Sequence, residues 1–460
     1  MVLAIWPLVI LVLFASLPAS RALIYATLSS YLLLPVATSF DLSGLPSLNK
    51  TTIPAFTILL CVAIFGRRKS LRAPKDRLIF LSMIVLVLAP VATALTNKGP
   101  LQYADLTING LTLYDGLAAS FAQVAMIIPF VCGYNMLSNE RGYRDLLMAL
   151  AVAGLIYTLP MLVEIRLSPQ LHRWVYGFHP QSFGQQIRDG GYRPVVFLGH
   201  GLLVATFCCM SLISAIALWR LRTRVFRLNP GLWAFYLAVI LILCKTLGSL
   251  AIAIIFAPAM WFLKPRRLAI VCALAGALIL VYPALRGGGL VPTATISSLA
   301  ASVSTDRAGS AQFRFDNEDR LLNRASQKPF FGWGSYGRNR VYDAQGRDIS
   351  ITDGTWIITV GQWGWIGYLA TFGLLCLPLL AVLWRSRRSA SPAAALLSVV
   401  LTVNLIDLIP NSSLSPVTWL IAGALAAAPR LTKRIRTGEH FDDGGELDPT
   451  ASPQAARVFG

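Results

Sequence analysis

Long apolar runs recur along this chain of 460 residues, and they constrain its fold more than any other feature of the sequence. A helix needs about 20 predominantly apolar residues to cross the hydrocarbon core of a bilayer. Candidate runs lie at 2–19, 22–38, 52–66, 78–95, 114–133, 146–164, 195–219, 231–244, 248–263, 268–284, 356–384, 392–410 and 413–429. Because the first two are also compatible with one broken or re-entrant unit, the sequence predicts an all-α, polytopic integral membrane protein with about 12 or 13 transmembrane helices.

The composition agrees with a membrane protein. Only 13% of the residues are charged, against about 25% in soluble domains, because ionisable groups in hydrocarbon cost several kcal/mol each. The net charge of +19 would also suit a nucleic-acid partner. The basic residues, however, lie in short clusters between the apolar runs, as the positive-inside rule predicts, and we expect no nucleic acid. All seven cysteines fall inside apolar runs, so we expect buried free thiols and no disulfide.

The basic clusters predict an orientation. They lie at 67–77, 220–227, 264–267, 385–388 and 430–436. All can face the cytoplasm only if 231–263 forms two helices with a turn at Lys245 to Gly248. The other side of the membrane then receives 96–113, 165–194, 286–355 and a tight turn at Asn411.

This orientation divides the chain into four parts. They are an N-terminal transmembrane bundle, 1–285, which includes the non-cytoplasmic loop 165–194; a large polar segment, 286–355; C-terminal transmembrane helices, 356–430; and a polar tail, 431–460, that we expect to be cytoplasmic and disordered. The first apolar run has no basic residue before it, so we expect a retained helix and not a signal peptide.

The polar segment 286–355 is the best candidate for chemistry at the membrane surface. It holds nine Lys/Arg and seven Asp/Glu between Arg286 and Asp353. Arg320 and Arg324 are four residues apart, so a helix would place both guanidinium groups on one face, where they could clamp a phosphate. The alternative is a solvated helix on which these arginines pair with neighbouring acids.

A glycine-rich turn would end that helix at 329–337. Its backbone N–H groups could cradle an anion, although such turns are common. Arg338 and Arg340 follow at once and raise the positive charge density. Asp353 then precedes an apolar run, where it could act as a general base or cap the next helix.

A second candidate region precedes the run 195–219. Arg193 lies at its mouth on the side where basic residues are uncommon, either as a functional group or as a snorkelling anchor. His200 would lie about two turns inside that run, and it could serve in proton transfer or in packing. The nearby His172 and His179 are compatible with ordinary surface positions.

Metal-binding and nucleotide-binding motifs are absent from the candidate regions: the chain has no HExxH, CxxC or P-loop, and the polar segment has no DxD-like pair. The sequence therefore predicts no metal and no cofactor, and arginines must neutralise any anionic leaving group. A lipid-linked pyrophosphate that arrives from the bilayer would fit this requirement.

Several short motifs carry a resemblance to a known family. They are Arg193-Pro-Val-Val-Phe-Leu-Gly-His200-Gly before an apolar run, Lys245-Thr-Leu-Gly-Ser249 at a tight hairpin, Arg320 followed by Lys328-Pro-Phe-Phe-Gly-Trp-Gly, Asp353-Gly-Thr-Trp, and Gly361-Gln-Trp-Gly-Trp-Ile-Gly367. Their order, over roughly 192–380, resembles the superfamily of O-antigen ligases and O-antigen or exopolysaccharide polymerases. The resemblance implies a fold of the metal-independent, lipid-sugar-using glycosyltransferase kind in the bacterial inner membrane, with 286–355 as a long periplasmic loop.

The same resemblance implies substrates and residue roles. The enzyme would transfer a glycan from undecaprenyl pyrophosphate to a hydroxyl acceptor, with Arg193 and Arg320 on the pyrophosphate. The ligases carry a histidine late in the long loop, where this chain has Asp353 instead, which favours a polymerase of repeat units. We therefore expect Arg193, Arg320, Arg324, Arg338 and Arg340 to bind substrate and Asp353 or His200 to take the proton.

The expected partners are the lipid-linked oligosaccharide, a glycan acceptor, membrane lipid, and a chain-length regulator or export partner. A ligase that acts on a lipid A-core acceptor, a transporter or flippase of the same lipid-linked glycan, and a structural or assembly protein are the alternatives. Transporters tend to carry charges at the membrane midplane, whereas the few charges inside these runs lie near their predicted ends.

Overall fold

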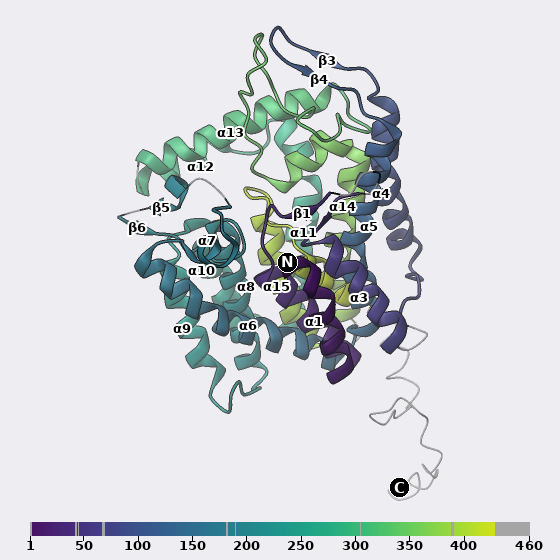
Figure 1. Ribbon diagram of the computed structural model, residues 1–460. Coiled ribbons are helices and arrows are strands. Elements are labelled where there is room, and N and C mark those ends of the chain that lie inside the picture. Colours follow the sequence, from purple (N-terminus) through teal and green to yellow (C-terminus); the bar gives the residue numbers. More distant parts are fainter. Residues whose placement is uncertain are drawn as a thin grey trace, which may run out of the picture.

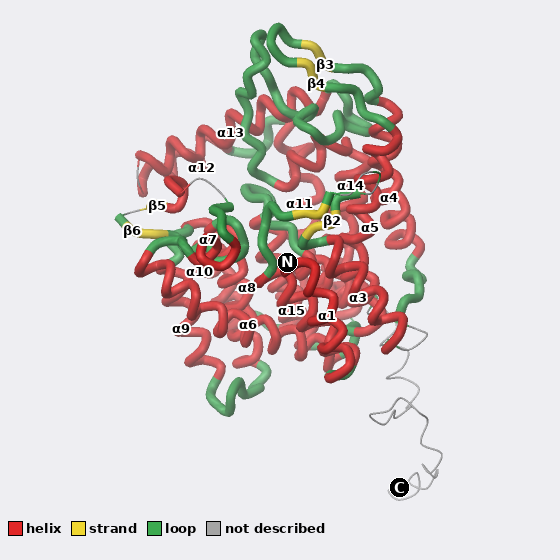
Figure 2. Tube along the Cα trace, viewed as in Figure 1, coloured by secondary structure: helices red, strands yellow, loops and turns green. Residues whose placement is uncertain are grey.

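A computed structural model describes residues 2–41, 44, 46–66, 70–180, 183–188, 190–303, 305–387 and 391–427. Helices dominate this part of the chain, and the strands form only three short hairpins (Figure 2). The helices are α1 (Val2–Ser16), α2 (Ala19–Leu33), α3 (Thr52–Phe65), α4 (Arg77–Thr96), α5 (Leu113–Met136), α6 (Glu140–Leu167), α7 (Leu171–Tyr176), α8 (Gly201–Arg220), α9 (Pro230–Leu243), α10 (Leu247–Phe262), α11 (Pro265–Gly287), α12 (Thr293–Val303), α13 (Thr305–Ser326), α14 (Thr355–Ser386), α15 (Pro392–Asp407) and α16 (Pro416–Ala426), with a 3₁₀ turn η1 (Phe183–Gln186). The antiparallel pairs are β1 (Ser39–Phe40) with β2 (Leu48–Asn49), β3 (Leu101–Gln102) with β4 (Thr107–Ile108), and β5 (Ile187–Arg188) with β6 (Gly191–Tyr192).

The helices confirm the prediction of an all-α membrane protein. Six helices of the described chain, α4, α5, α6, α8, α11 and α14, are long and apolar enough to cross a bilayer, and six further apolar helices are shorter. Each of the thirteen predicted runs corresponds to a helix, but six of the described helices, and not the predicted 12 or 13, have the length and hydropathy of a membrane span. The predicted division of 231–263 is also confirmed, because α9 ends at Leu243 and α10 begins at Leu247. The predicted tail, 431–460, lies outside the described residues.

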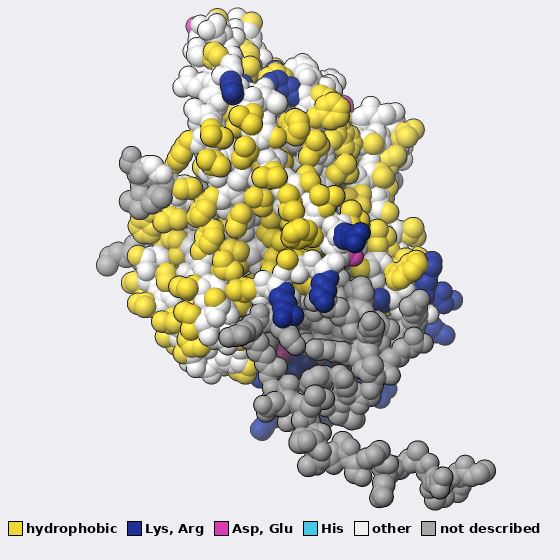
Figure 3. Space-filling model, turned by 90° about the vertical axis from the view of Figure 1, so that its right-hand side faces the viewer, with side chains coloured by type: hydrophobic (Ala, Val, Ile, Leu, Met, Phe, Trp, Pro, Cys, Tyr) yellow, Lys and Arg dark blue, Asp and Glu magenta, His cyan; other side chains and the backbone are white. Residues whose placement is uncertain are grey.

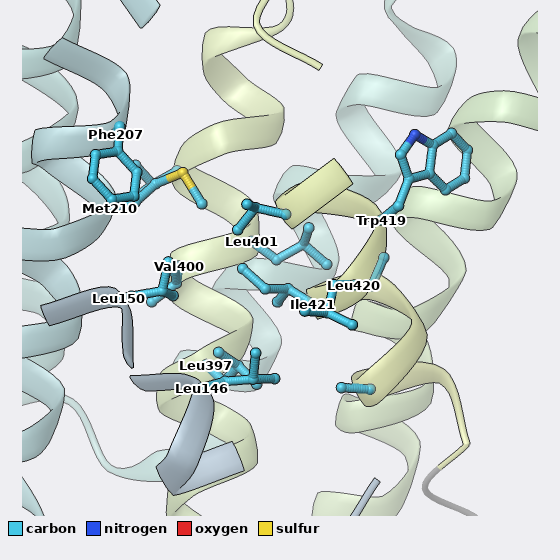
Figure 4. Close-up of a cluster of buried hydrophobic side chains, with 14 of the residues drawn as sticks. Leu146, Leu150, Phe207, Met210, Leu397, Val400, Leu401, Trp419, Leu420 and Ile421 are labelled. Carbon is cyan, nitrogen blue, oxygen red and sulfur yellow. The ribbon is translucent and has the colours of Figure 1, made fainter. Parts of the chain in front are cut away.

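Helices α6, α8, α15 and α16 form the centre of the bundle. Leu146 and Leu150 of α6 face Leu397 and Val400 of α15, and the side chains of α8 and α16 fill the same layer (Figure 4). All seven cysteines are buried and unpaired. Because α15 and α16 are buried on nearly every side, they are apolar all round, as expected for central helices.

Hydrophobic side chains also cover much of the outer surface. Exposed examples lie on helices around the periphery of the bundle, such as Leu88, Phe235, Ile254, Ile255 and Leu274. On the face shown in Figure 3, hydrophobic side chains occupy a broad zone between Lys and Arg side chains above and below it. This pattern is typical of a lipid-facing belt between two solvent-exposed ends.

The loop between α8 and α9, which carries the basic cluster 220–227, and the helices of the polar segment 286–355 lie at opposite ends of the bundle. α6 ends beside the loop 193–200, where its Glu164 carboxylate accepts hydrogen bonds from two N–H groups of that loop. α8 runs back from Gly201 to Arg220, whose guanidinium donates to the Met260 carbonyl near the end of α10. The loop between α8 and α9 therefore lies at the end of the molecule opposite to α12 and α13 (Figure 1).

Segments far apart in the sequence meet at the end that carries α13. The β3–β4 hairpin donates two backbone hydrogen bonds to the carbonyls of 344–345. Arg193 donates to Thr246 Oγ1, in the break between α9 and α10, and Arg314 of α13 donates to the Pro410 carbonyl. These hydrogen bonds thus join described parts of 96–113, 286–355 and the turn at Asn411, whereas Arg193 is bonded to the turn between α9 and α10.

The polar segment 286–355 is only partly a loop, because α12 and α13 occupy much of it. The predicted helix around Arg320 is confirmed: α13 ends at Ser326, before the proline of the glycine-rich turn. Arg286, at the end of α11, anchors α13. Its guanidinium lies 3.3 Å from a Glu318 carboxylate oxygen and 2.8 Å from one of Asp319.

The apolar run 356–384 forms one long helix, α14, with an interruption at Gly364, where φ is 65° and ψ is −168°. This break frees backbone groups that the turn 329–334 satisfies. The four hydrogen bonds are Trp333 N–H to Gly361 O (2.9 Å), Gly334 N–H to Gln362 O (2.9 Å), Trp365 N–H to Pro329 O (2.7 Å) and Ile366 N–H to Phe330 O (3.3 Å). Two of the motifs singled out in the sequence therefore bind each other, and their conformations depend on each other.

Candidate functional site

The loop between β6 and α8 carries Arg193 at its start and His200 at its end. The Glu164 carboxylate holds this loop by accepting the N–H groups of Val195 at 2.7 Å and Val196 at 2.8 Å. Val196 has a left-handed backbone, with φ 48°, a conformation that costs a β-branched residue about 1–3 kcal/mol. The surrounding structure must hold this backbone in place, and the loop is therefore a rigid support for both side chains.

Arg193 is almost completely buried, with 5% of its surface exposed. One terminal nitrogen donates to Thr246 Oγ1 at 2.9 Å, but the Nε–H has no partner. Beside it, the Gln186 amide is 3% exposed, and neither its nitrogen nor its oxygen has a partner. Buried polar atoms nearly always have hydrogen-bond partners, so these side chains are arranged for a polar ligand or for water.

His200 caps the N-terminus of α8, because its Nδ1 accepts the Leu202 N–H at 3.0 Å. It thus precedes the helix, whereas hydropathy predicted a position two turns inside it. With Nδ1 as the acceptor, a neutral ring carries its proton on Nε2. Burial, with the positive charges of Arg193, Arg314 and Arg188 nearby, lowers the pKa of His200 to about 4. At neutral pH, His200 is therefore an uncharged hydrogen-bond donor among cations, and in this arrangement Nε2 is not a base.

Arg314 of α13 joins this group from the other side. It lies within electrostatic range of Arg193 and His200. Its Nε is 3.6 Å from a carboxylate oxygen of Asp353, and it lines a cavity of about 220 Å³ together with Asp353 and Tyr282. Arg314 is thus close to Asp353 and within electrostatic range of His200, the two predicted catalytic residues. Asp353 does not cap α14, because the capping position belongs to Gly354.

Asp407 places a buried carboxyl group beside these cations, in range of Arg314. Its side chain is at the end of α15 and is 2% exposed. The carboxyl oxygens accept Thr206 Oγ1–H at 2.8 Å and Asn411 Nδ2–H at 2.8 Å. Within the described chain, no Lys or Arg forms an ion pair with it. The group Arg188, Arg193, His200, Arg314 and Asp407 is called the basic cluster below.

Arg320 and Arg340, predicted to bind substrate, lie outside the basic cluster. Arg320 donates to the Ile349 carbonyl at 3.2 Å and is exposed. Arg340 forms an ion pair with Asp348 at 2.6 Å, with about half of its side chain exposed (47%). Neither is held in a buried site, so their roles in substrate binding stay predictions.

Arg324 and Arg338 have structural partners. The Arg324 guanidinium lies 3.4 Å from the centre of the Trp333 ring. Arg338 is buried and donates to the carbonyls of Gly99 (3.0 Å), Asn109 (2.7 Å) and Trp333. These contacts fasten the glycine-rich turn to the segment 96–113, which explains two of the predicted arginines without a substrate.

Replacing Arg338 by Met should therefore reduce stability. Three backbone carbonyls would lose a charged donor; the bond to Trp333 is buried, and those to Gly99 and Asn109 are partly buried. Each buried group left unsatisfied costs about 1–3 kcal/mol. We expect a clear fall in the thermal unfolding midpoint of the purified protein, whereas Arg340→Met should change the unfolding free energy by less than about 1 kcal/mol, as exposed ion pairs do. A stable Arg338→Met variant that loses its substrate would instead support the role predicted from the sequence.

The low pKa of His200 predicts a pH dependence of stability. In the unfolded chain a histidine titrates near pH 6.5, and in the folded protein the pKa of His200 is about 4. The unfolded state therefore binds more protons in this window, so the contribution is complete above about pH 6.5 and is lost as the pH falls toward 4. His200→Asn keeps a helix cap. The difference in unfolding midpoint between wild type and this variant should shrink from pH 7.5 to pH 5; a constant difference would contradict the assignment.

Two larger cavities lie elsewhere. One, of about 600 Å³, lies between α4, α5 and the turn at 335–336; Asp41 and Asp115 line it, and among the described residues no Lys or Arg does. The other, also about 600 Å³, lies at the opposite end of the bundle. At the end that carries α13, Arg314 is the member of the basic cluster that lines the cavity of about 220 Å³, together with Asp353 and Glu318; the arginines of the cluster, more than the cavity itself, favour an anionic substrate there.

No protein-family model matches the chain, and no curated protein matches it significantly. The interpretation of the site therefore depends on its geometry.

Sequence reasoning found Arg193, His200 and Asp353, but it missed Arg314 and Gln186. Arg314 was detectable, because it precedes the buried Leu321 by seven residues and so shares its helix face. Gln186 ends the short 3₁₀ turn η1, and the sequence had no comparable signal for it.

Proposed function

We propose that the protein polymerises oligosaccharide repeat units carried on undecaprenyl pyrophosphate, in exopolysaccharide or O-antigen synthesis at the periplasmic face of the bacterial inner membrane. The observation that carries this proposal is the Nε–H of buried Arg193, which has no hydrogen-bond partner. The Gln186 amide beside it also has no partner, and Arg314 lies within electrostatic range of Arg193. Guanidinium groups bind phosphate oxygens through paired, charge-assisted hydrogen bonds. The apolar helices beside this site offer a place for the polyprenyl chain.

The basic cluster divides the chemical roles. Arg193 and Arg314 hold the pyrophosphate and stabilise the negative charge that grows on it as a leaving group. His200, as a neutral donor, adds a hydrogen bond without a further charge. The acceptor hydroxyl oxygen attacks the anomeric carbon, the bond from that carbon to the phosphate oxygen breaks, and the hydroxyl proton passes to Asp353. The 3.6 Å approach of Asp353 to Arg314 supports this position for the base.

Analysis of a deletion strain tests the proposal. Envelope glycans would be separated on gels, and the lipid-linked intermediates would be identified by mass. Single repeat units that accumulate on the carrier, with no longer chains, are the expected result. Plasmid-borne wild type should restore the polymer, and Arg193→Ala should not, at equal amounts of protein in the membrane.

Other results would redirect or overturn the proposal. Full-length chains stranded on undecaprenyl pyrophosphate would indicate a ligase, which uses the same donor. Repeat units confined to the cytoplasmic leaflet would indicate a flippase. An unchanged glycan profile would remove the proposed substrate altogether.

A further inference from the structure

A third cavity, of about 600 Å³, lies at the end of the bundle opposite to the basic cluster. The loop between α8 and α9 and the ends of α8 and α10 form it. Four arginines line it, Arg220, Arg222, Arg224 and Arg227, and no acidic residue of the described chain does. The Arg220 guanidinium donates to the Met260 carbonyl. The other three guanidinium groups form no hydrogen bond or ion pair with the described residues, so their charges are available to a ligand.

Two tryptophans mark the depth of this cavity relative to the bilayer. Trp219 lies in the last turn of α8 and Trp261 in the last turn of α10; their rings are 4.4 Å apart between centroids and are partly exposed. Both follow long apolar stretches, which is where tryptophan lies at membrane–water interfaces. The arginines beside them are thus at the level of lipid headgroups.

Hydrogen bonds define the backbone of this loop. Arg222, with φ 54°, ends α8 in a left-handed C-terminal motif, in which the Thr223 N–H donates to the Leu218 carbonyl. Phe226 and Arg227, with φ 49° and 63°, form the two-residue turn between the bridged Val225 and Leu228. The arginines of this loop are therefore carried on a defined backbone.

We infer that this cavity binds the phosphate of an anionic phospholipid headgroup. Guanidinium groups bind phosphate oxygens through paired, charge-assisted hydrogen bonds, and basic pockets between transmembrane helices bind anionic lipid headgroups. The apolar surfaces of α9 and α10 continue from the cavity into the proposed bilayer zone, where they can contact the acyl chains. Free phosphate shares the headgroup chemistry but has no acyl chains. This site is independent of the proposed glycan chemistry.

Native mass spectrometry of the full-length protein in detergent can measure the binding. The probes are cardiolipin, phosphatidylglycerol, phosphatidylcholine and inorganic phosphate. Arg224→Gln/Arg227→Gln removes two charges from the cavity; Arg266→Gln/Arg267→Gln removes two exposed charges at the same end, outside the cavity. We expect the Kd for cardiolipin to rise roughly 10- to 30-fold in the first variant and less than about 3-fold in the second.

Three results would overturn the inference: equal losses in the two variants, equal binding of phosphatidylcholine, or inorganic phosphate that binds as tightly as the lipids. A fluorescence measurement on the wild-type protein tests the site even if the arginine variant misfolds. Brominated phosphatidylglycerol should quench the wild-type protein more than brominated phosphatidylcholine, and Trp219→Phe/Trp261→Phe should remove this excess. Equal quenching by both lipids in the wild type would also count against the site.

Discussion

Replacing Arg193 by alanine is expected to weaken binding of the pyrophosphate-linked donor by about 10- to 100-fold and to abolish polymer formation. A hydrogen bond to a charged group contributes about 1.5–3 kcal/mol, and each 1.4 kcal/mol corresponds to about tenfold in affinity. Arg193 is buried and already has its position set by Thr246. Little conformational entropy is therefore lost when the ligand binds.

The measurement is donor binding and chain extension by the purified protein in proteoliposomes. Arg193→Lys should fall between wild type and alanine, because lysine keeps the charge but lacks the planar fork. Arg320→Ala is the informative comparison. The sequence assigns Arg320 to the pyrophosphate, whereas in the structure it is exposed and donates to a backbone carbonyl. We expect Arg320→Ala to retain chain extension; its loss, with Arg193→Ala active, would move the site to the outer face of α13.

Hydropathy was sufficient to predict the helices of the apolar runs, because the bilayer sets both the length and the polarity of a span; it gave no sign of α7 or α12. Each apolar run corresponds to a helix, and the basic clusters located the break between Leu243 and Leu247. The ends of helices were less predictable. Polarity alone places the end of one run at 410, whereas α15 ends at Asp407. Hydrogen bonds hold the turn that follows, because the Asn411 amide donates to the Asp407 carboxylate and the Asn411 carbonyl accepts from Thr355.

The candidate site was less predictable than the helices, because it depends on tertiary contacts between distant segments. Arg193 and His200 stood out as polar residues at the mouth of an apolar run. Arg324 and Arg338 stood out equally, yet in the structure Arg324 lies against the Trp333 ring and Arg338 donates to three backbone carbonyls. Sequence shows that an arginine is unusual in its place, but only the fold shows whether its donors are already used.

Replacing Gly364 by alanine is expected to destabilise the protein more than any other glycine-to-alanine substitution in α14. Its φ of 65° and ψ of −168° belong to a region that essentially only glycine occupies, at a cost of about 1–3 kcal/mol for other residues. The new Cβ would also meet the Phe330 carbonyl and lie 2.6 Å from the Phe331 nitrogen. Relief of this overlap would break the hydrogen bonds that hold the turn 329–334.

Gly373→Ala is the matched control in the same helix. Its Cβ would meet only Ser82 Oγ, at 4.0 Å, so the change should be neutral or stabilising by about 0.5–1 kcal/mol, as alanine is in a helix interior. Thermal unfolding of both variants in detergent measures the difference. We expect Gly364→Ala to lower the unfolding midpoint and Gly373→Ala to leave it unchanged or raise it. Because the turn at 329–334 directly follows α13, Gly364→Ala should also loosen the C-terminal end of that helix and lower donor binding through Arg314. A Gly364→Ala protein as stable as wild type would mean that α14 can run straight through this position, and that the turn is not what holds α13 over the site.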